Sequence, residues 1–156
     1  MTADPKPSVN RFRDRKFCAL LYPEDPTHAE AIEKLKTGGY MFAAILHDKD
    51  VYEDGDHKGE LKKPHWHVVI KFSNAVWNVP TAKTLGIEPN YLQQCSNLDG
   101  ALLYLVHEGN PDKHQYDLEE VFGVLKTRLA ALLADDDEGT RALTIFNLIP
   151  MRRKSP

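Results

Sequence analysis

Short apolar runs that end at Pro, Gly or polar positions alternate along this chain with segments of helical spacing. The runs predict four strands, since they are rich in aliphatic and aromatic residues, at residues 17–22, 40–47, 64–72 and 91–95. Apolar residues at helical spacing predict helices at residues 26–36, 79–86, 97–107 and 118–133. Thr27 is the expected cap of the first helix.

Strands interspersed with helices and joined by hairpin-like connections predict an α+β domain, with helices packed on a central antiparallel sheet. Residues 1–14 are polar and basic and predict a flexible arm. Residues 15–134 would form the folded domain. The acidic stretch from Asp135 to Gly139 is expected to end the last helix, which leaves residues 135–156 as an acidic and then basic tail.

Composition narrows the class of protein. The 156 residues are 42% hydrophobic and 28% charged, which suits one compact domain. No apolar run approaches the roughly 18 residues of a membrane-spanning helix, and the charged N-terminus lacks a signal-peptide core. Cys18 and Cys95 have no CxxC spacing, which excludes a disulfide scaffold or a thiolate zinc site. We therefore expect a cytoplasmic protein without a membrane partner.

Net charge is −3, but basic residues are concentrated locally. Such patches suit a phosphate backbone, because each neutralised phosphate releases counterions whatever the global charge. A solvated surface is an equally good interpretation of charge alone. The candidate DNA-binding residues are Arg11, Arg13, Arg15, Lys16, Lys62, Lys63 and Lys71.

Candidate chemistry centres on a histidine pair in the third predicted strand. His65 and His67 are two positions apart, so both imidazoles lie on the same face of the strand. His47 ends the preceding strand, and an antiparallel return through the loop at 48–63 would bring His47 and Asp50 beside His65. Three imidazoles and a carboxylate suit Mn²⁺, Zn²⁺ or Co²⁺ better than an all-oxygen magnesium site. The other histidines in polar segments, His28 and His57, are interpreted as surface residues.

A tyrosine in the third predicted helix is the candidate nucleophile. Tyr104 in an aliphatic helix is ordinarily a residue at the edge of the core, but beside a metal site its phenol could attack a phosphodiester. His107 follows three positions later, on the expected same helical face. Tyr116 has a similar basic context and is the alternative nucleophile. Familiar hydrolase motifs, such as His-Glu-x-x-His, the P-loop and Gly-x-Ser-x-Gly, are absent.

Five ordered blocks resemble the HUH endonucleases, specifically the small replication initiators of rolling-circle plasmids of the streptococcal type. The resemblance runs from Phe17 to Tyr116. The blocks are FCALLYPE at 17–24, HDKD at 47–50, KKPHWHV at 62–68, YLVHE at 104–108 and KHQY at 113–116.

The resemblance implies roles for individual residues. His47, Asp50, His65 and His67 match the family's metal ligands, with Mn²⁺ the expected ion and Mg²⁺ or other divalent ions as alternatives. Tyr104 matches the nicking tyrosine. The implied activity is site- and strand-specific nicking and joining of DNA at the plasmid double-strand origin, through a 5′-phosphotyrosyl link that leaves a free 3′-OH for replication.

Two other functions stay open at this point. The chain could be a DNA-binding module without catalysis on the same fold, or a related nuclease that serves mobilisation, transposition or a virus. Host replication proteins are further partners that the resemblance allows. Members of the family often carry an additional oligomerisation domain, so the oligomeric state cannot be transferred to this chain.

Overall fold

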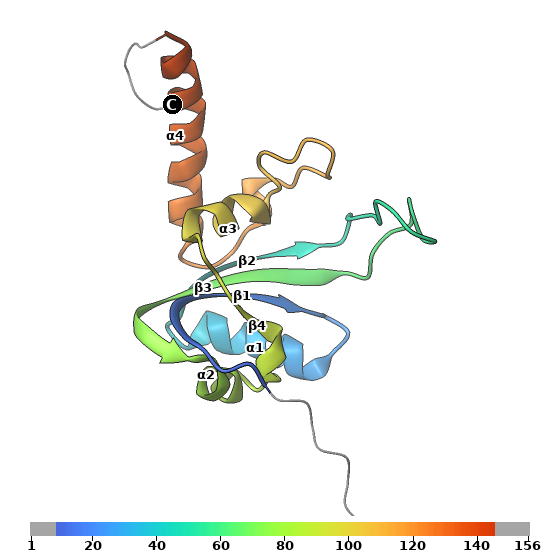
Figure 1. Cartoon of the computed structure of the whole chain (residues 1–156), viewed down its shortest axis with the longest axis vertical. Coiled ribbons are helices and arrows are strands. Elements are labelled where there is room, and N and C mark those ends of the chain that lie inside the picture. Colours follow the sequence, from blue (N-terminus) through green and yellow to red (C-terminus); the bar gives the residue numbers. More distant parts are fainter. Residues whose placement is uncertain (1–8, 146–156) are drawn as a thin grey trace, which may run out of the picture.

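A computed structural model describes residues 9–145, with side chains described through residue 135. The predicted α+β fold is confirmed: four helices pack on a four-stranded antiparallel sheet (Figure 1). The strands are β1 (Arg13–Leu21), β2 (Met41–His47), β3 (His65–Trp77) and β4 (Leu92–Gln94). The helices are α1 (Pro26–Thr37), α2 (Asn78–Leu85), α3 (Leu98–Leu105) and α4 (Lys126–Ile145), and single 3₁₀ turns lie at Pro89–Tyr91 and Leu118–Glu120.

The strand order is β2-β3-β1-β4, and every neighbouring pair is antiparallel. Strand β3 therefore lies inside the sheet between β2 and β1. Its register places His47 of β2 directly opposite His65, and Leu20 of β1 opposite His67. This register brings His47 and His65, which are distant in the sequence, next to each other.

The sheet has a hydrophobic core on each face. Helices α1 and α2 cover one face, where Phe17 and Ile70 pack with Leu35 and Leu85. Helices α3 and α4 lie on the opposite face (Figure 1). Because side chains alternate along a strand, His65 and His67 share the α3/α4 face with the buried Val69.

Two strands are longer than their apolar runs predict. Strand β1 begins at Arg13, within the predicted arm, and β3 continues to Trp77, because these two ends pair with each other. Main-chain pairing thus extends the strands through residues whose side chains are polar. Residues 1–8 of the predicted arm and residues 146–156 of the predicted tail lie outside the described residues.

The cap of α1 differs from the prediction. Asp25, and not Thr27, occupies the N-cap, and its carboxylate accepts a hydrogen bond from the Thr27 amide at 2.9 Å. Pro26 then occupies the first helical turn, where its missing amide hydrogen costs nothing.

The last helix was wrongly predicted at both ends. After the 3₁₀ turn, the chain is extended, and Phe122 exchanges main-chain hydrogen bonds with Ala44 of β2 at 2.8 and 2.9 Å. Helix α4 therefore begins only at Lys126, and its backbone continues to Ile145 through the acidic stretch that was expected to end it. None of the helices in the described part of the chain is both long and apolar enough to span a membrane.

Candidate active site

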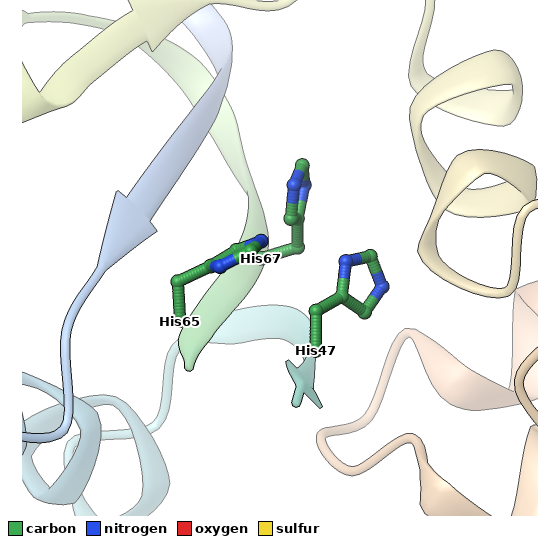
Figure 2. A group of neighbouring side chains, drawn as sticks. All are labelled: His47, His65 and His67. Carbon is green, nitrogen blue, oxygen red and sulfur yellow. The ribbon is translucent and has the colours of Figure 1, made fainter. Parts of the chain in front are cut away.

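Three imidazoles meet at one end of β2 and β3. Figure 2 shows His47 on one strand and His65 and His67 on the next, with their rings gathered around a common space. Each offers one nitrogen, and these nitrogens lie within 4.8 Å of one another. The ring centroids of His47 and His67 are 4.6 Å apart. The proximity predicted from strand spacing and an antiparallel return is therefore observed.

Hydrogen bonding determines which nitrogen of His47 is free. Its Nε2 lies 2.7 Å from the carbonyl oxygen of Leu105 in α3, and since a carbonyl only accepts, Nε2 must carry the proton. Nδ1 is fully buried and makes no hydrogen bond of good geometry, and the Asp50 carboxylate lies 3.2 Å from it. A buried nitrogen of this kind is costly unless something, such as a cation, binds to it.

Two more histidines are oriented in the same way. His65 Nδ1 donates to the Lys63 carbonyl at 2.8 Å, and His107 Nδ1 donates to the His114 carbonyl at 2.8 Å. Nε2 is therefore the nitrogen that each ring turns toward the cluster. For His65, burial lowers the pKa, but the Asp50 carboxylate facing Nε2 at 3.5 Å outweighs burial and raises it. Metal-binding histidines characteristically donate their second ring nitrogen to a carbonyl or carboxylate, which holds the ring in the ligating tautomer.

His67 is held neutral by its surroundings. Burial, followed by the neighbouring His47 and His65 rings, lowers the pKa of His67 to about 3. A neutral imidazole keeps the lone pair that a metal ion needs.

Asp50 lies against two of these rings rather than among all three. Its Oδ2 is 3.2 Å from His47 Nδ1 and 3.5 Å from His65 Nε2. Burial alone would raise the pKa of this carboxyl, but the close His47 and His65 rings and the hydrogen bond from Tyr116 outweigh burial and hold the pKa well below its ordinary value. In the part of the chain with described side chains, Asp50 joins a second group of close donors with His47 and His107. The four predicted ligands are thus divided between two sets that share His47. One set is His47, His65 and His67, and the other is His47, Asp50 and His107.

This donor set fits a divalent cation. His47, His65 and His67 each bring one ring nitrogen to a common point, and the Asp50 carboxylate adds negative charge beside His47 and His65. Nitrogen and oxygen donors together suit Mn²⁺ and its neighbours in the first transition series.

Tyr104 reaches the cluster from α3. Its side chain is 37% exposed, and its ring lies 5.7 Å from that of His67 and 5.0 Å from that of His107. The helix ends at Leu105, so His107 lies beyond it, in a left-handed conformation with φ of 62°. The prediction that Tyr104 and His107 share a helical face was therefore wrong, although the turn after α3 still brings the two rings together.

Tyr116 has a different environment. It is only 5% exposed, its ring stacks on His47 at 4.4 Å, and its hydroxyl donates to Asp50 Oδ1 at 2.7 Å. The same hydroxyl accepts from the Lys49 amide at 3.0 Å. Burial, with the Asp50 hydrogen bond second, raises the pKa of Tyr116. This phenol supports the position of Asp50.

An open cleft of about 360 Å³ gives access to the cluster. Tyr104, His65 and His67 lie in its wall. Several other lining residues were not predicted from the sequence, because no periodic pattern distinguishes them from other strand and loop residues. Those residues include Leu20, Tyr22, Tyr52, Glu53, Lys113 and His114.

The predicted DNA-binding residues divide into two regions. Lys62 and Lys63 line the cleft. Arg13 pairs with Trp77 at the far end of β3, and Lys16 pairs with Lys71 nearer to the middle. Arg11 and Arg15 are exposed close to Arg13.

The two histidines predicted to be at the surface differ. His57 is exposed, as predicted. His28 is buried, and its Nδ1 accepts a hydrogen bond from the Tyr22 amide at 3.0 Å, so the surface prediction was wrong for this residue. Its role is to tie α1 to the end of β1.

Residues 9–126 match the family model described as plasmid replication protein, origin binding domain. Since the match covers most of the chain, the protein belongs to this family. The chain is 31% identical over 149 residues to "Replication protein RepB" of Lactiplantibacillus plantarum, covering 92% of this chain and 65% of that protein.

Two further relatives carry the name "Replication protein". One, from Onion yellows phytoplasma (strain OY-M), is 32% identical over 98 residues, which cover 58% of this chain and 26% of the relative. The other, from Staphylococcus aureus, is 29% identical over 111 residues, which cover 70% of this chain and 53% of the relative. The chain spans less than two thirds of the length of each of these relatives.

Proposed function

We propose that this protein binds plasmid origin DNA and nicks one strand through Tyr104, in a reaction that depends on a divalent metal ion and initiates rolling-circle replication. The family supports the DNA partner. The observation that carries the chemistry is the exposed phenol of Tyr104 in the same cleft as His65 and His67, whose nitrogens converge with one from the buried His47.

His47, His65 and His67 would hold the ion, with Asp50 or His107 as a further ligand on the side of His47. When bound, a divalent ion supplies positive charge that polarises a phosphodiester and stabilises the leaving oxygen. Mn²⁺ fits these donors best, and Mg²⁺ is the main alternative. Leu105, Lys63 and His114 contribute main-chain carbonyls that keep the ligating rings oriented.

Tyr104 performs the covalent step. Its phenolic oxygen forms a bond to phosphorus as its proton leaves, and the bond from phosphorus to the 3′ oxygen breaks. The leaving oxygen takes a proton to become a free 3′-OH, and the 5′-phosphate remains on the tyrosine. The reverse reaction, attack by a 3′-OH on the phosphotyrosyl bond, rejoins the strand and releases Tyr104.

The choice of Tyr104 over Tyr116 rests on access. Tyr104 is open to the cleft, whereas the Tyr116 hydroxyl is already bonded to Asp50 and the Lys49 amide. Attack by Tyr116 would break both hydrogen bonds and would require a phenol whose pKa is raised to lose its proton.

The test is adduct formation with a pool of single-stranded oligonucleotides of random sequence, so that no origin sequence is assumed. With Mn²⁺, a dye on the 3′ end should move with the protein in a denaturing gel, whereas a dye on the 5′ end should be released. Sequencing the trapped strands would identify the recognised site.

Tyr104→Phe should abolish the adduct and Tyr116→Phe should retain it. An adduct that persists in Tyr104→Phe would overturn the assignment, and mass spectrometry of the linked peptide would then identify the nucleophile. A module that binds DNA without catalysis predicts no adduct in any variant, with or without metal. A relative that serves mobilisation, transposition or a virus predicts the same adduct at a different recognised sequence.

A further inference from the structure

The hairpin between β2 and β3 extends beyond the end of the sheet, next to the loop that follows α3 (Figure 1). Main-chain hydrogen bonds hold it in shape: the Tyr52 amide donates to Glu60 at 3.0 Å and the Lys62 amide to Asp50 at 2.8 Å. Val51 and Leu61 form a bridge between its two arms. The hairpin is therefore a defined element whose side chains have fixed places.

This hairpin exposes apolar side chains that folding does not use. Val51 is 42% exposed, Tyr52 is 40% exposed and Leu61 is 66% exposed. Val51 and Tyr52 line the same cleft as Tyr104, whereas Leu61 is not among the lining residues. The hairpin thus places apolar side chains, one of them aromatic, at the edge of the candidate active site.

A cation accompanies the Tyr52 ring. Lys62 Nζ lies 5.7 Å from the ring centroid, and no carboxylate in the described part of the chain forms an ion pair with it. The neighbouring cleft lysines are different, since Lys63 pairs with Glu24 and Lys113 pairs with Glu53. Lys62 thus places a positive charge over the Tyr52 ring and has no ion-pair partner among the described residues, and the His57 ring lies 5.7 Å from the Tyr52 ring.

The ion pair between Lys113 and Glu53 also holds the hairpin that carries Tyr52 and Lys62 in place. It joins the hairpin to the loop after α3, and that loop carries His107, whose ring is in contact with Tyr104. Tyr52 is consequently held on the wall of the cleft, with the histidines and the candidate nucleophile on the same cleft surface.

We propose that Tyr52 and Lys62 form a nucleotide subsite, in which a base of single-stranded DNA stacks on the Tyr52 ring while Lys62 binds the adjoining phosphate. Aromatic rings with neighbouring cations are the usual elements of single-strand binding. Duplex DNA is excluded as the occupant, because both faces of each base are already covered by neighbouring base pairs. This inference rests on the proposed function, which places a single strand in the cleft.

The test measures binding without chemistry. A dye-labelled thymidine oligonucleotide is titrated by fluorescence anisotropy in EDTA, with wild type, Tyr52→Ala, Tyr52→Phe and Leu61→Ala. Tyr52→Ala should weaken binding about 5- to 150-fold, since one base on an aromatic ring contributes about 1–3 kcal/mol. Tyr52→Phe and the exposed control Leu61→Ala should bind like wild type.

An abasic oligonucleotide of the same length provides the second arm. Without bases, wild type and Tyr52→Ala should bind equally weakly, because only the phosphate contacts remain. Lys62→Ala should weaken both strands. Unchanged binding by Tyr52→Ala, an equal loss in Tyr52→Phe, or an equal loss for duplex DNA would each overturn the subsite.

The two proposals fail separately. Binding in EDTA reports on the subsite whether or not Tyr104 nicks DNA, and the metal-dependent adduct reports on Tyr104 whether or not Tyr52 stacks on a base. Loss of the subsite with an intact adduct would refute only the present inference.

Discussion

His47 has one of the most constrained side chains in the molecule. It is wholly buried, stacks on Tyr116 and donates to Leu105, and yet its Nδ1, 3.2 Å from the Asp50 carboxylate, makes no hydrogen bond of good geometry. Proteins rarely leave a buried polar atom unsatisfied, because such an atom costs about 1–3 kcal/mol. At the residue scale, this single atom is the strongest indication of a metal site.

Metal binding is therefore expected to stabilise the fold. Mn²⁺ at about 100 times its dissociation constant should raise the free energy of unfolding by about 2.7 kcal/mol, which is measured as an increase in melting temperature. His67→Ala should remove most of this shift. His57→Ala, which changes an exposed histidine outside the cleft, should retain it. An equal shift in wild type and His67→Ala would exclude this residue as a ligand.

Tyr116 is expected to contribute to stability rather than to chemistry. Tyr116→Phe removes a hydrogen bond to a carboxylate and the acceptor of the Lys49 amide, so the free energy of unfolding should fall by about 1.5–3 kcal/mol in urea denaturation. Tyr52→Phe removes a hydroxyl from an exposed tyrosine and should change stability little. If the two variants have equal free energies of unfolding, the hydrogen bond between Tyr116 and Asp50 does not stabilise the fold.

At the scale of elements, the segment before α4 locks that helix to the sheet. Gly123 has a φ of 100°, and a Cβ placed there would lie 2.3 Å from the Phe42 carbonyl oxygen of β2. Only glycine allows the two backbones to approach this closely. The close approach positions Leu129 of α4 in the core that also contains α3.

Gly123→Ala should accordingly destabilise the protein more than an ordinary left-handed glycine would. Gly109 is the matched control, since its φ is 83° and a Cβ there meets nothing within 4 Å. Both substitutions have the cost of a left-handed alanine, but Gly123→Ala adds a backbone clash of about 1–3 kcal/mol. Denaturant midpoints of the two variants provide the comparison, and equal midpoints would contradict the close packing described for Gly123.

At the scale of the whole molecule, the predicted DNA-binding side chains, all of them among the described residues, lie in two regions. One is the cleft with Lys62 and Lys63, and the other surrounds Arg13 at the far end of β1 and β3. A protein that recognises an origin and also nicks one strand needs contacts to both duplex and single-stranded DNA. We interpret the distant region as the duplex contact.

This division predicts different salt dependences. Replacing Arg11, Arg13 and Arg15 by alanine should weaken duplex binding and flatten the plot of log affinity against log salt by about 0.9 for each lost phosphate contact. Adduct formation with short single strands should be unchanged. Arg128→Ala, which removes an exposed arginine of α4 that pairs with Asp99 of α3, is the control. A triple variant with an unchanged slope would exclude this region from duplex binding.

The fold class and the histidine pair were predictable, because both depend on local periodicity. Strand alternation puts His65 and His67 on one face whatever the rest of the chain does, and the apolar runs mark where the four strands lie. The start of α4 was not predictable from the pattern, because residues 118–125 have helical spacing, and the pairing of Phe122 with Ala44 overrides it.

The amino-acid sequence thus specified which candidate metal ligands exist, which of them share a strand face and which family the protein resembles. Only tertiary packing decided how those donors combine. The β2–β3 register sets His47 against His65, the turn after α3 brings His107 to the same ring, and the buried Tyr116 holds Asp50 beside it. The physical reason is that side-chain alternation acts between neighbours in sequence, whereas tautomers, orphaned nitrogens and clefts arise from contacts between segments far apart in the chain.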